Sequence, residues 1–259
     1  MRVFDFDRAI VREPAASVVD GLRTGAEAPS YSRVLDEHRA YVAALEAAGV
    51  AVETLPALPE HPDSVFVEDP AFVLPEGAIL LRPGAPSRLG ETASLLAVLE
   101  LHFEAVAEVN EGFVDGGDIL ILPDEILVGL SERTDRAGAE RFRDLARDLG
   151  RSARIVEPPR GLLHFKTGSA LVDEGTVIAV PAMAPLFRSY DVLITPPGEK
   201  PSANLIRVND RILMGTGFPG TAAKLADRGL EVVSTPASEI AKIDAGLSCM
   251  SLRWNSQAK

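Results

Sequence analysis

The sequence predicts an α/β fold in which one structural unit is repeated around a ring. The unit is two strands joined by a turn, then a helix, then a third strand. It recurs about every 40–50 residues, a period typical of repeat architectures. Four complete units follow one another, and half-units remain at the two ends of the chain. Because pairing of the two ends would complete a fifth unit, we expect one closed, pseudo-fivefold domain over residues 1–259.

The N-terminal half-unit is a strand, a helix and a second strand. Residues 9–13 are apolar enough for a short strand, and two glycines and a proline within 21–31 predict a mobile loop. Apolar residues then recur at helical spacing from Val34 to Leu45, and Gly49 is a typical helix stop. Residues 50–55 form the second predicted strand.

The four complete units are predicted from hairpin patterns, in which turn residues separate two strand-like runs. The predicted hairpin strands are 66–74 and 78–82, 118–122 and 126–130, 164–172 and 176–180, and 204–208 and 211–214. The predicted helices are 88–101, 135–149, 183–189 and 220–228, and the third strands are 105–109, 153–157, 191–195 and 230–234. A last strand near 249–253 is left to pair with the N-terminal strand.

The composition limits the kinds of molecule that the protein is expected to bind. The formal net charge of −12 would repel nucleic-acid phosphates but suits a small cationic substrate. The chain has no apolar run of membrane-spanning length, and its N-terminus lacks a signal-peptide core. We therefore expect a cytoplasmic protein, monomer or homodimer, that binds neither nucleic acid nor membranes.

Cys249 is the only cysteine, so it can form neither an internal disulfide nor a thiolate metal site. It is either a buried small hydrophobe, as free cysteines often are, or a nucleophile. Polar or reactive residues also stand at the start of each unit's first predicted strand. They are Glu68 and Asp69, Asp115 to Asp118, His164, Asn204 and Cys249.

Each of these residues also has a structural interpretation. Asp69 precedes a proline, Asp115-Gly-Gly-Asp118 and Asn204 suit turns, and a single His is often a core residue. Their shared position in the repeat favours function, because equivalent strand starts in a ring converge on its axis. The sequence thus predicts that acid, His, Asn and Cys side chains meet at one place.

The chain resembles the dimethylarginine dimethylaminohydrolase family of the guanidino-group-modifying (pentein) superfamily along nearly its whole length. The matching segments, in the family's order, are Asp63-Ser-Val-Phe-Val-Glu-Asp-Pro70, Arg82-Pro-Gly-Ala-Pro-Ser-Arg88, Asp115-Gly-Gly-Asp118, Val128-Gly-Leu-Ser-Glu-Arg-Thr134, Leu163-His-Phe-Lys-Thr167, Ala203-Asn204 and Gly246-Leu-Ser-Cys-Met-Ser-Leu-Arg253. The resemblance implies a five-bladed α/β propeller. It also implies hydrolysis of Nω-methylated arginines to citrulline and dimethylamine or methylamine, without a metal or organic cofactor.

The resemblance also implies a role for each site residue. Cys249 is the nucleophile that forms a covalent thiouronium, His164 the general acid/base and Asp115 its acidic partner. The implied substrate-binding residues are Asp69, Glu68 and Asp63 around the guanidinium, Arg88 and Arg133 at the α-carboxylate, and Leu22 in a lid loop.

Other functions remain open at this stage. An arginine deiminase would use the same Cys, His and acid on free arginine, and a non-catalytic ring would only bind arginine-like ligands. Gly215-Thr-Gly-Phe-Pro-Gly220 matches the dinucleotide-binding pattern, although Pro219 interrupts it and no clear ribose-binding acid follows. The absence of H-E-x-x-H and C-x-x-C spacings disfavours a metalloenzyme.

Overall fold

The computed structural model describes residues 1–258, which form five three-stranded sheets of the same design. In each sheet the middle strand is antiparallel to one neighbour and parallel to the other. The sheets, with the middle strand second, are β15 (Leu252–Trp254), β1 (Arg8–Arg12) and β2 (Ala51–Leu55); β3 (Ala71–Leu74), β4 (Gly77–Leu80) and β5 (Val106–Glu108); β6 (Ile119–Ile121), β7 (Ile126–Gly129) and β8 (Ala153–Val156); β9 (Ser169–Leu171), β10 (Thr176–Ala179) and β11 (Asp191–Ile194); and β12 (Ile206–Val208), β13 (Arg211–Gly215) and β14 (Glu231–Thr235). The predicted fivefold repeat of an α/β unit is confirmed.

The fifth sheet joins the two ends of the chain, as predicted. β15 runs antiparallel to β1, with Ala9 opposite Arg253, and β1 runs parallel to β2. This sheet therefore has the same strand directions as the other four, although its strands come from opposite ends of the sequence.

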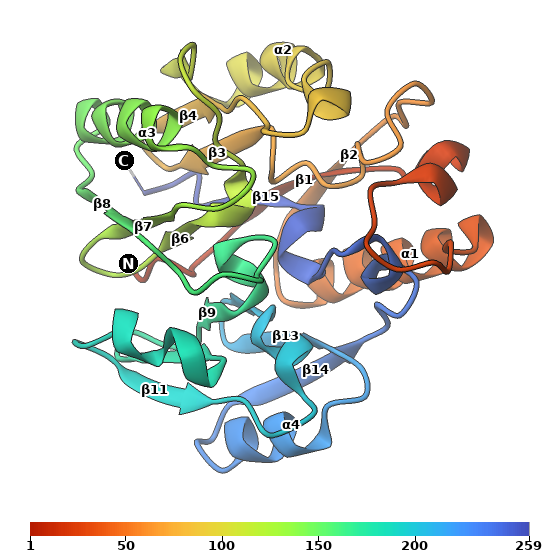
Figure 1. The fold of residues 1–259 in the computed structure, drawn as a ribbon, viewed down its shortest axis with the longest axis vertical. Coiled ribbons are helices and arrows are strands. Elements are labelled where there is room, and N and C mark those ends of the chain that lie inside the picture. The colour runs from red at the N-terminus through yellow and green to blue at the C-terminus, as the bar shows by residue number, and fades with distance from the viewer. Residues whose placement is uncertain (259) are drawn as a thin grey trace.

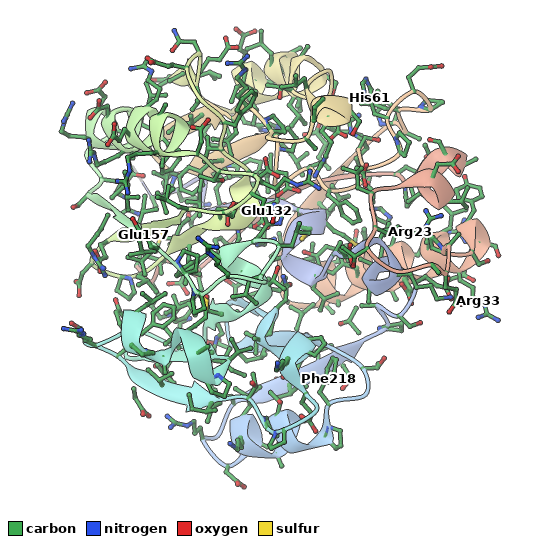
Figure 2. The ribbon with its side chains drawn as sticks, viewed as in Figure 1. Arg23, Arg33, His61, Glu132, Glu157 and Phe218 are labelled. Atoms are coloured by element: carbon green, nitrogen blue, oxygen red, sulfur yellow. The ribbon has the colours of Figure 1, made fainter. Side chains whose placement is uncertain are left out.

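Four α-helices connect the strands, and Figure 1 shows them at the periphery with the strands between them. They are α1 (Tyr31–Ala47), α2 (Ala93–His102), α3 (Arg136–Asp148) and α4 (Pro219–Ala226). In α1 the buried residues Val34, Tyr41 and Leu45 recur at helical spacing, whereas Arg33 points outward into solvent (Figure 2). The helices therefore cover the sheets with one apolar face each.

Sequence patterns place two of the predicted helices incorrectly. The predicted helix 183–189 is instead a 3₁₀ segment at Pro181–Leu186, because Pro185 stands inside it and cannot donate an α-helical hydrogen bond. The helix predicted from residue 88 begins at Ala93, after a separate 3₁₀ turn at Pro86–Arg88.

The first strand of each complete unit is shorter than predicted. The polar residues expected at the strand starts lie instead in turns or 3₁₀ segments that precede the strands. These segments are Gly116–Asp118, Phe165–Thr167, Lys200–Ala203 and Leu247–Met250. Their side chains bind backbone groups of neighbouring segments, which draws the chain out of the extended conformation. The candidate site residues therefore stand on short loops next to the strands.

Within residues 1–258, no helix combines the length and the apolar character needed to cross a bilayer.

Candidate active site

Eight of the nine residues implicated from sequence line one cavity of about 200 Å³. They are Leu22, Asp63, Asp69, Arg88, Asp115, Arg133, His164 and Cys249. Arg23 and Glu132 line it as well. Of the residues that the repeat predicted to converge, Asp69, Asp115, His164 and Cys249 line this cavity, whereas Glu68, Asp118 and Asn204 do not.

His164 is buried and its ring Nε2 lies 3.0 Å from the Asp115 carboxylate. Burial by itself lowers the pKa of His164. The charge of Asp69, the hydrogen bond to Asp115 and the charge of Asp118 outweigh burial and raise that pKa to about 9. His164 therefore carries a proton at neutral pH and is ready to act as an acid.

The two glycines between Asp115 and Asp118 are required by close packing. A Cβ on Gly117 would lie 2.7 Å from His164 Cγ and 3.0 Å from Asp69 Oδ1. A Cβ on Gly116 would lie 1.9 Å from the carbonyl oxygen of Glu68. The two glycines therefore allow the backbone to approach the His164 ring and the Glu68 carbonyl oxygen closely.

Cys249 lies in the 3₁₀ segment Leu247–Met250, just before β15. Asn204 supports this turn, because its Oδ1 accepts a hydrogen bond from the backbone N–H of Ser248 at 3.1 Å. Burial, together with the charges of Asp69 and Glu68, raises the pKa of the Cys249 thiol to about 12. The thiol is therefore protonated at neutral pH.

Asp69 is the acid expected to hold a guanidinium, and in this structure it holds one. Nη1 of Arg88 binds Asp69 Oδ2, and the backbone N–H of Gly117 donates to Oδ1 at 3.0 Å. Burial raises the pKa of Asp69, but Arg88 and His164 outweigh burial and keep that pKa below its ordinary value.

Arg88, which is predicted to bind the substrate's α-carboxylate, already makes several hydrogen bonds within the protein. Its Nε and Nη2 donate to the Glu91 carboxylate, and Nη2 also donates to the carbonyl oxygens of Asp63 and Phe66. Binding of a substrate carboxylate by Arg88 stays a prediction, and it would require some of these bonds to be exchanged. The ion pair between Arg88 and Glu91 was not predicted from the sequence, although their i,i+3 spacing could have indicated it.

Arg133 and Leu22 line this cavity, and their roles in substrate binding stay predictions. The guanidinium of Arg133 lines the cavity and has no hydrogen-bond or ion-pair partner among the described residues, so it is available for a carboxylate. The backbone N–H of Leu22 donates to Asp63 Oδ1 at 3.0 Å, and the side chain is 38% exposed at the cavity. The next turn of this loop is tied down by Asp244, whose Oδ2 accepts from the Thr24 N–H at 2.6 Å.

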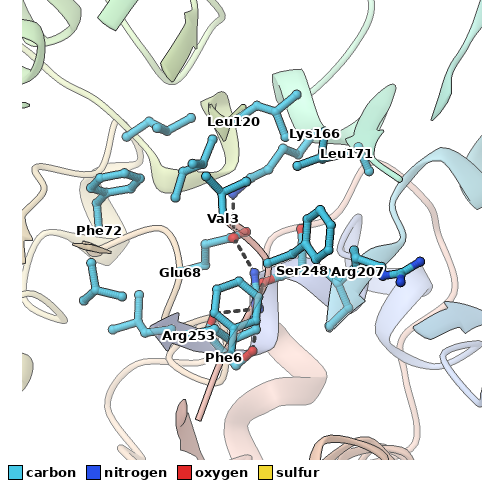
Figure 3. A pocket seen from close by; sticks show the side chains of 18 of the residues that line it. Val3, Phe6, Glu68, Phe72, Leu120, Lys166, Leu171, Arg207, Ser248 and Arg253 are labelled. Carbon is cyan, nitrogen blue, oxygen red and sulfur yellow. Dashed lines mark hydrogen bonds and ion pairs between the residues drawn. The ribbon is translucent and has the colours of Figure 1, made fainter. Parts of the chain in front are cut away.

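Glu68, which the resemblance places at the guanidinium, does not line this cavity, and its contact with a substrate stays a prediction. Its Oε1 lies 2.5 Å from Lys166 Nζ and 3.4 Å from Arg253 Nη2. These three side chains line a separate cavity of about 110 Å³, covered by N-terminal residues including Phe6 (Figure 3). Two cations thus draw the Glu68 carboxylate away from this cavity. Glu68 still contacts Cys249, because its charge raises the pKa of the thiol and its backbone N–H donates to the Cys249 carbonyl oxygen at 3.2 Å.

Asp69, Asp115 and His164 have ligand atoms within 4.8 Å of one another, a spacing that would suit a metal ion. Each of these groups already has a protein partner, however. Arg88 binds Asp69, and His164 binds Asp115. The positive charge that balances these acids is therefore supplied by Arg88 and protonated His164.

The glycine-rich segment 215–220 does not provide a phosphate site. β13 pairs antiparallel with β12, as the predicted hairpin requires, and parallel with β14 across α4, so the segment also opens a crossover helix. The N–H groups of Gly220 and Thr221 at the start of that helix donate to the Glu199 carboxylate at 2.8 and 2.7 Å. An acid of the chain occupies the position that a pyrophosphate would need.

Comparison with known proteins agrees with this geometry. Residues 24–150 match the family model described as N,N dimethylarginine dimethylhydrolase, eukaryotic. The N(G),N(G)-dimethylarginine dimethylaminohydrolase of Pseudomonas aeruginosa is 37% identical over 96% of this chain and 100% of its own length. The enzyme of the same name from Streptomyces coelicolor is 35% identical over 95% of this chain and 96% of its own.

A solved structure extends the likeness to three dimensions. The P. aeruginosa protein, as a cysteine-to-serine mutant in complex with citrulline, superposes with a TM-score of 0.93 at 36% identity. The match covers 96% of this chain and 100% of that one. On the sequence identity and its coverage, this chain belongs to the dimethylarginine dimethylaminohydrolase family.

Proposed function

We propose that this protein hydrolyses Nω-methylated arginines to citrulline and dimethylamine or methylamine, with Cys249 as the nucleophile. The observation that carries the proposal is the shared cavity. It places the single cysteine, a His164–Asp115 pair and the acids Asp63 and Asp69 around one small space. Family membership at 37% identity supports the same activity.

The cavity has complementary ends for a guanidino amino acid. Asp69 and Asp63 provide carboxylates for the planar, positively charged guanidinium, to which they would make charge-assisted hydrogen bonds. Arg133 provides an unpaired cation for the α-carboxylate. Leu22, on the loop above, would cover the bound substrate and exclude water.

The substrate activates the nucleophile by its charge. In the free site the acids hold the Cys249 thiol in its protonated form, with a pKa of about 12. A guanidinium bound to Asp69 neutralises the charge that opposes the thiolate, so the thiol loses its proton to solvent when substrate binds. The Cys249 thiolate therefore forms only when a substrate is bound.

The reaction then proceeds in two balanced halves. The Cys249 thiolate adds to the guanidinium carbon, protonated His164 donates its proton to the departing nitrogen, and the C–N bond breaks. Dimethylamine leaves and a cationic thiouronium remains on Cys249. Neutral His164 next takes a proton from water, whose oxygen adds to the thiouronium carbon. Collapse breaks the C–S bond, returns the hydroxyl proton to the sulfur and releases citrulline.

We also propose that the five sheets close into a propeller that forms one domain, with the site at one end of its axis. Two observations support closure. The terminal strands β15 and β1 pair, and the cavity beneath the site is lined by residues from β3, β6, β9, β12 and β15. Each sheet thus contributes one strand to the same axial space. Lys259 lies outside the described residues.

Product analysis tests the activity. Purified protein is given asymmetric dimethylarginine, monomethylarginine or arginine, and citrulline and amine release are measured for wild type and Cys249→Ser. We expect citrulline and stoichiometric methylated amine from the first two substrates and no turnover by the variant. Preferential release of ammonia from arginine would assign a deiminase instead, and binding of all three without turnover would indicate a ligand-binding ring.

A further inference from the structure

The second acid of the Asp115-Gly-Gly-Asp118 motif has no part in the mechanism above. Asp118 is 0% exposed and lines none of the cavities around Cys249. A carboxylate that is fully buried yet outside the reaction needs a physical reason, because removing an ionised group from water is costly unless its oxygens are fully bonded.

The reason is a set of three hydrogen bonds, all donated to Asp118. Its Oδ2 accepts from Ser131 Oγ at 2.6 Å and from Thr134 Oγ1 at 2.7 Å. Its Oδ1 accepts from the backbone N–H of Phe165 at 2.8 Å. Burial raises the pKa of Asp118, and the hydrogen bonds from Ser131, Thr134 and Phe165 oppose that rise because they stabilise the ionised carboxylate.

Each of these three partners is linked to a residue of the proposed site, either by a hydrogen bond or as its neighbour in the chain. Thr134 Oγ1 accepts the backbone N–H of Asp115 at 3.1 Å. Ser131 Oγ accepts the backbone N–H of Arg133 at 3.0 Å. Phe165 directly follows His164 in the chain.

We propose that Asp118 is the positioning residue that fixes Asp115, Arg133 and His164 relative to one another. The inference rests on the proposed function and deepens it, because it assigns the geometry of three site residues to one buried carboxylate. Asp115, Arg133 and His164 stand on three separate loops, before β6, after β7 and before β9. Asp118 bonds to the second and third loops and is itself part of the first. One group therefore spans two consecutive units of the repeat.

The hydrogen bonds of Asp118 connect it to the proposed site by two separate routes. Thr134 leads to Asp115, the partner of the imidazole, and so to the chemical step. Ser131 leads to Arg133, and so to binding of the substrate's carboxylate. If Asp118 positions both, the two hydroxyls should affect different kinetic constants, whereas a purely structural cluster would affect only stability.

Three substitutions test this division. Thr134→Val is expected to lower kcat about tenfold with little change in KM, the effect of a hydrogen bond worth about 1.4 kcal/mol. Ser131→Ala is expected to raise KM about threefold to tenfold with little change in kcat, since it loosens Arg133 by one hydrogen bond. Asp118→Asn is expected to lower kcat/KM about 100-fold, because its amide NH₂ would face the hydroxyl donors and shift the loops.

Asp118→Asn has a second readout that misfolding would not give. The acids that face His164 are Asp69 from one loop and Asp115 and Asp118 from another. Loss of the Asp118 charge should lower the pKa of His164, so the ascending limb of the kcat/KM profile moves to lower pH.

The chain offers a matched control in another unit. Thr221 is also fully buried, and its Oγ1 donates to the Glu199 carboxylate at 2.8 Å, but no residue of the proposed site is bonded to this cluster. Thr221→Val should reduce the denaturation midpoint to a similar extent as Thr134→Val and leave kcat and KM unchanged.

The outcomes separate this inference from the activity itself. If wild type turns over methylarginines and Thr134→Val behaves like Thr221→Val, the positioning role is wrong and the proposed function stands. If kcat falls for Thr134→Val and KM rises for Ser131→Ala, the role is supported. A wild type without turnover would overturn the function, and the inference with it.

Discussion

The guanidinium of Arg88 is bound to the carboxylate of Asp69, the acid proposed to receive the guanidinium of the substrate. A side chain of the protein, with the same guanidinium group as the proposed substrate, thus pairs with the buried Asp69 carboxylate. A substrate has to share Asp69 with Arg88 or displace it. Asp69 also raises the pKa of both His164 and Cys249, so it is the acid that links binding to reactivity.

Asp69→Asn should therefore change turnover and thiol reactivity in opposite directions. Loss of the carboxylate removes a charged hydrogen bond to the substrate, and kcat/KM should fall at least about tenfold. The same change removes a charge that raises the pKa of Cys249, so alkylation by iodoacetamide at pH 8 should become faster. The chain has one cysteine, so incorporation measured by mass spectrometry reports on Cys249 alone. Slower alkylation in the variant would contradict this account.

The pH dependence of kcat/KM should rise toward an apparent pKa of about 9. The resting site holds a thiol and an imidazolium, and the reacting pair, thiolate and imidazolium, has one proton fewer. The first proton is lost with the pKa of His164, about 9, so kcat/KM should increase through neutral pH and level off above that value. A profile that is flat between pH 6 and 8 would contradict the assignment.

The same shift has a consequence for stability. The pKa of His164 is raised from its ordinary value of 6.5, so its charge stabilises the fold fully below that value. This contribution is lost as pH rises through about 9, and denaturation midpoints should fall over the same interval. His164→Gln should lack this dependence, which separates it from the titration of lysines and tyrosines.

Gly117→Ala should disable the enzyme without unfolding it. The added methyl group would lie 2.7 Å from the imidazole, which would have to move. Misplacement of a catalytic group by about 1 Å can cost about 100-fold in rate, so kcat should fall on that scale. Gly175→Ala is the control, because the nearest atom to its Cβ would be 3.9 Å away. Equal loss of activity in the two variants would mean that the effect is not steric.

Arg133→Ala should weaken substrate binding through the carboxylate end alone. Loss of a charged hydrogen bond costs about 1.5–3 kcal/mol, which corresponds to a rise in KM of about 10–100-fold. A methylated agmatine, which lacks the carboxylate, should be handled equally by variant and wild type. Arg160→Ala is the matched control, because Arg160 lines the neighbouring cavity of about 650 Å³ rather than the acidic one. An equal loss with both substrates would place Arg133 outside the carboxylate site.

Much of the architecture follows from local sequence pattern. Hairpins such as β3–β4, with Pro75-Glu-Gly77 between predicted strands, are visible because turn chemistry and apolar alternation act over a few residues. The repeat period then places Asp69, His164 and Cys249 in equivalent positions, and the structure brings them to one cavity.

Side-chain partnerships were less visible in the sequence. Nothing local indicates that Lys166 and Arg253 draw Glu68 into a separate cavity, or that Glu91 engages Arg88. These outcomes depend on which charges the tertiary structure brings together in low dielectric, and on how their burial is compensated. The strand starts were misplaced for a related reason, since long-range bonds such as Asp118 to the Phe165 N–H hold those residues in 3₁₀ turns.

The pairing of β15 with β1 also sets the order in which the enzyme can mature on the ribosome. The strands of four sheets are each local in sequence, and such contacts form early. The fifth sheet must wait until Leu252–Trp254 has emerged, and Cys249 lies in the turn that leads into that strand. A nascent chain can therefore hold four complete sheets before Cys249 is in place, so the thiol acquires its acidic surroundings only in the last step of folding.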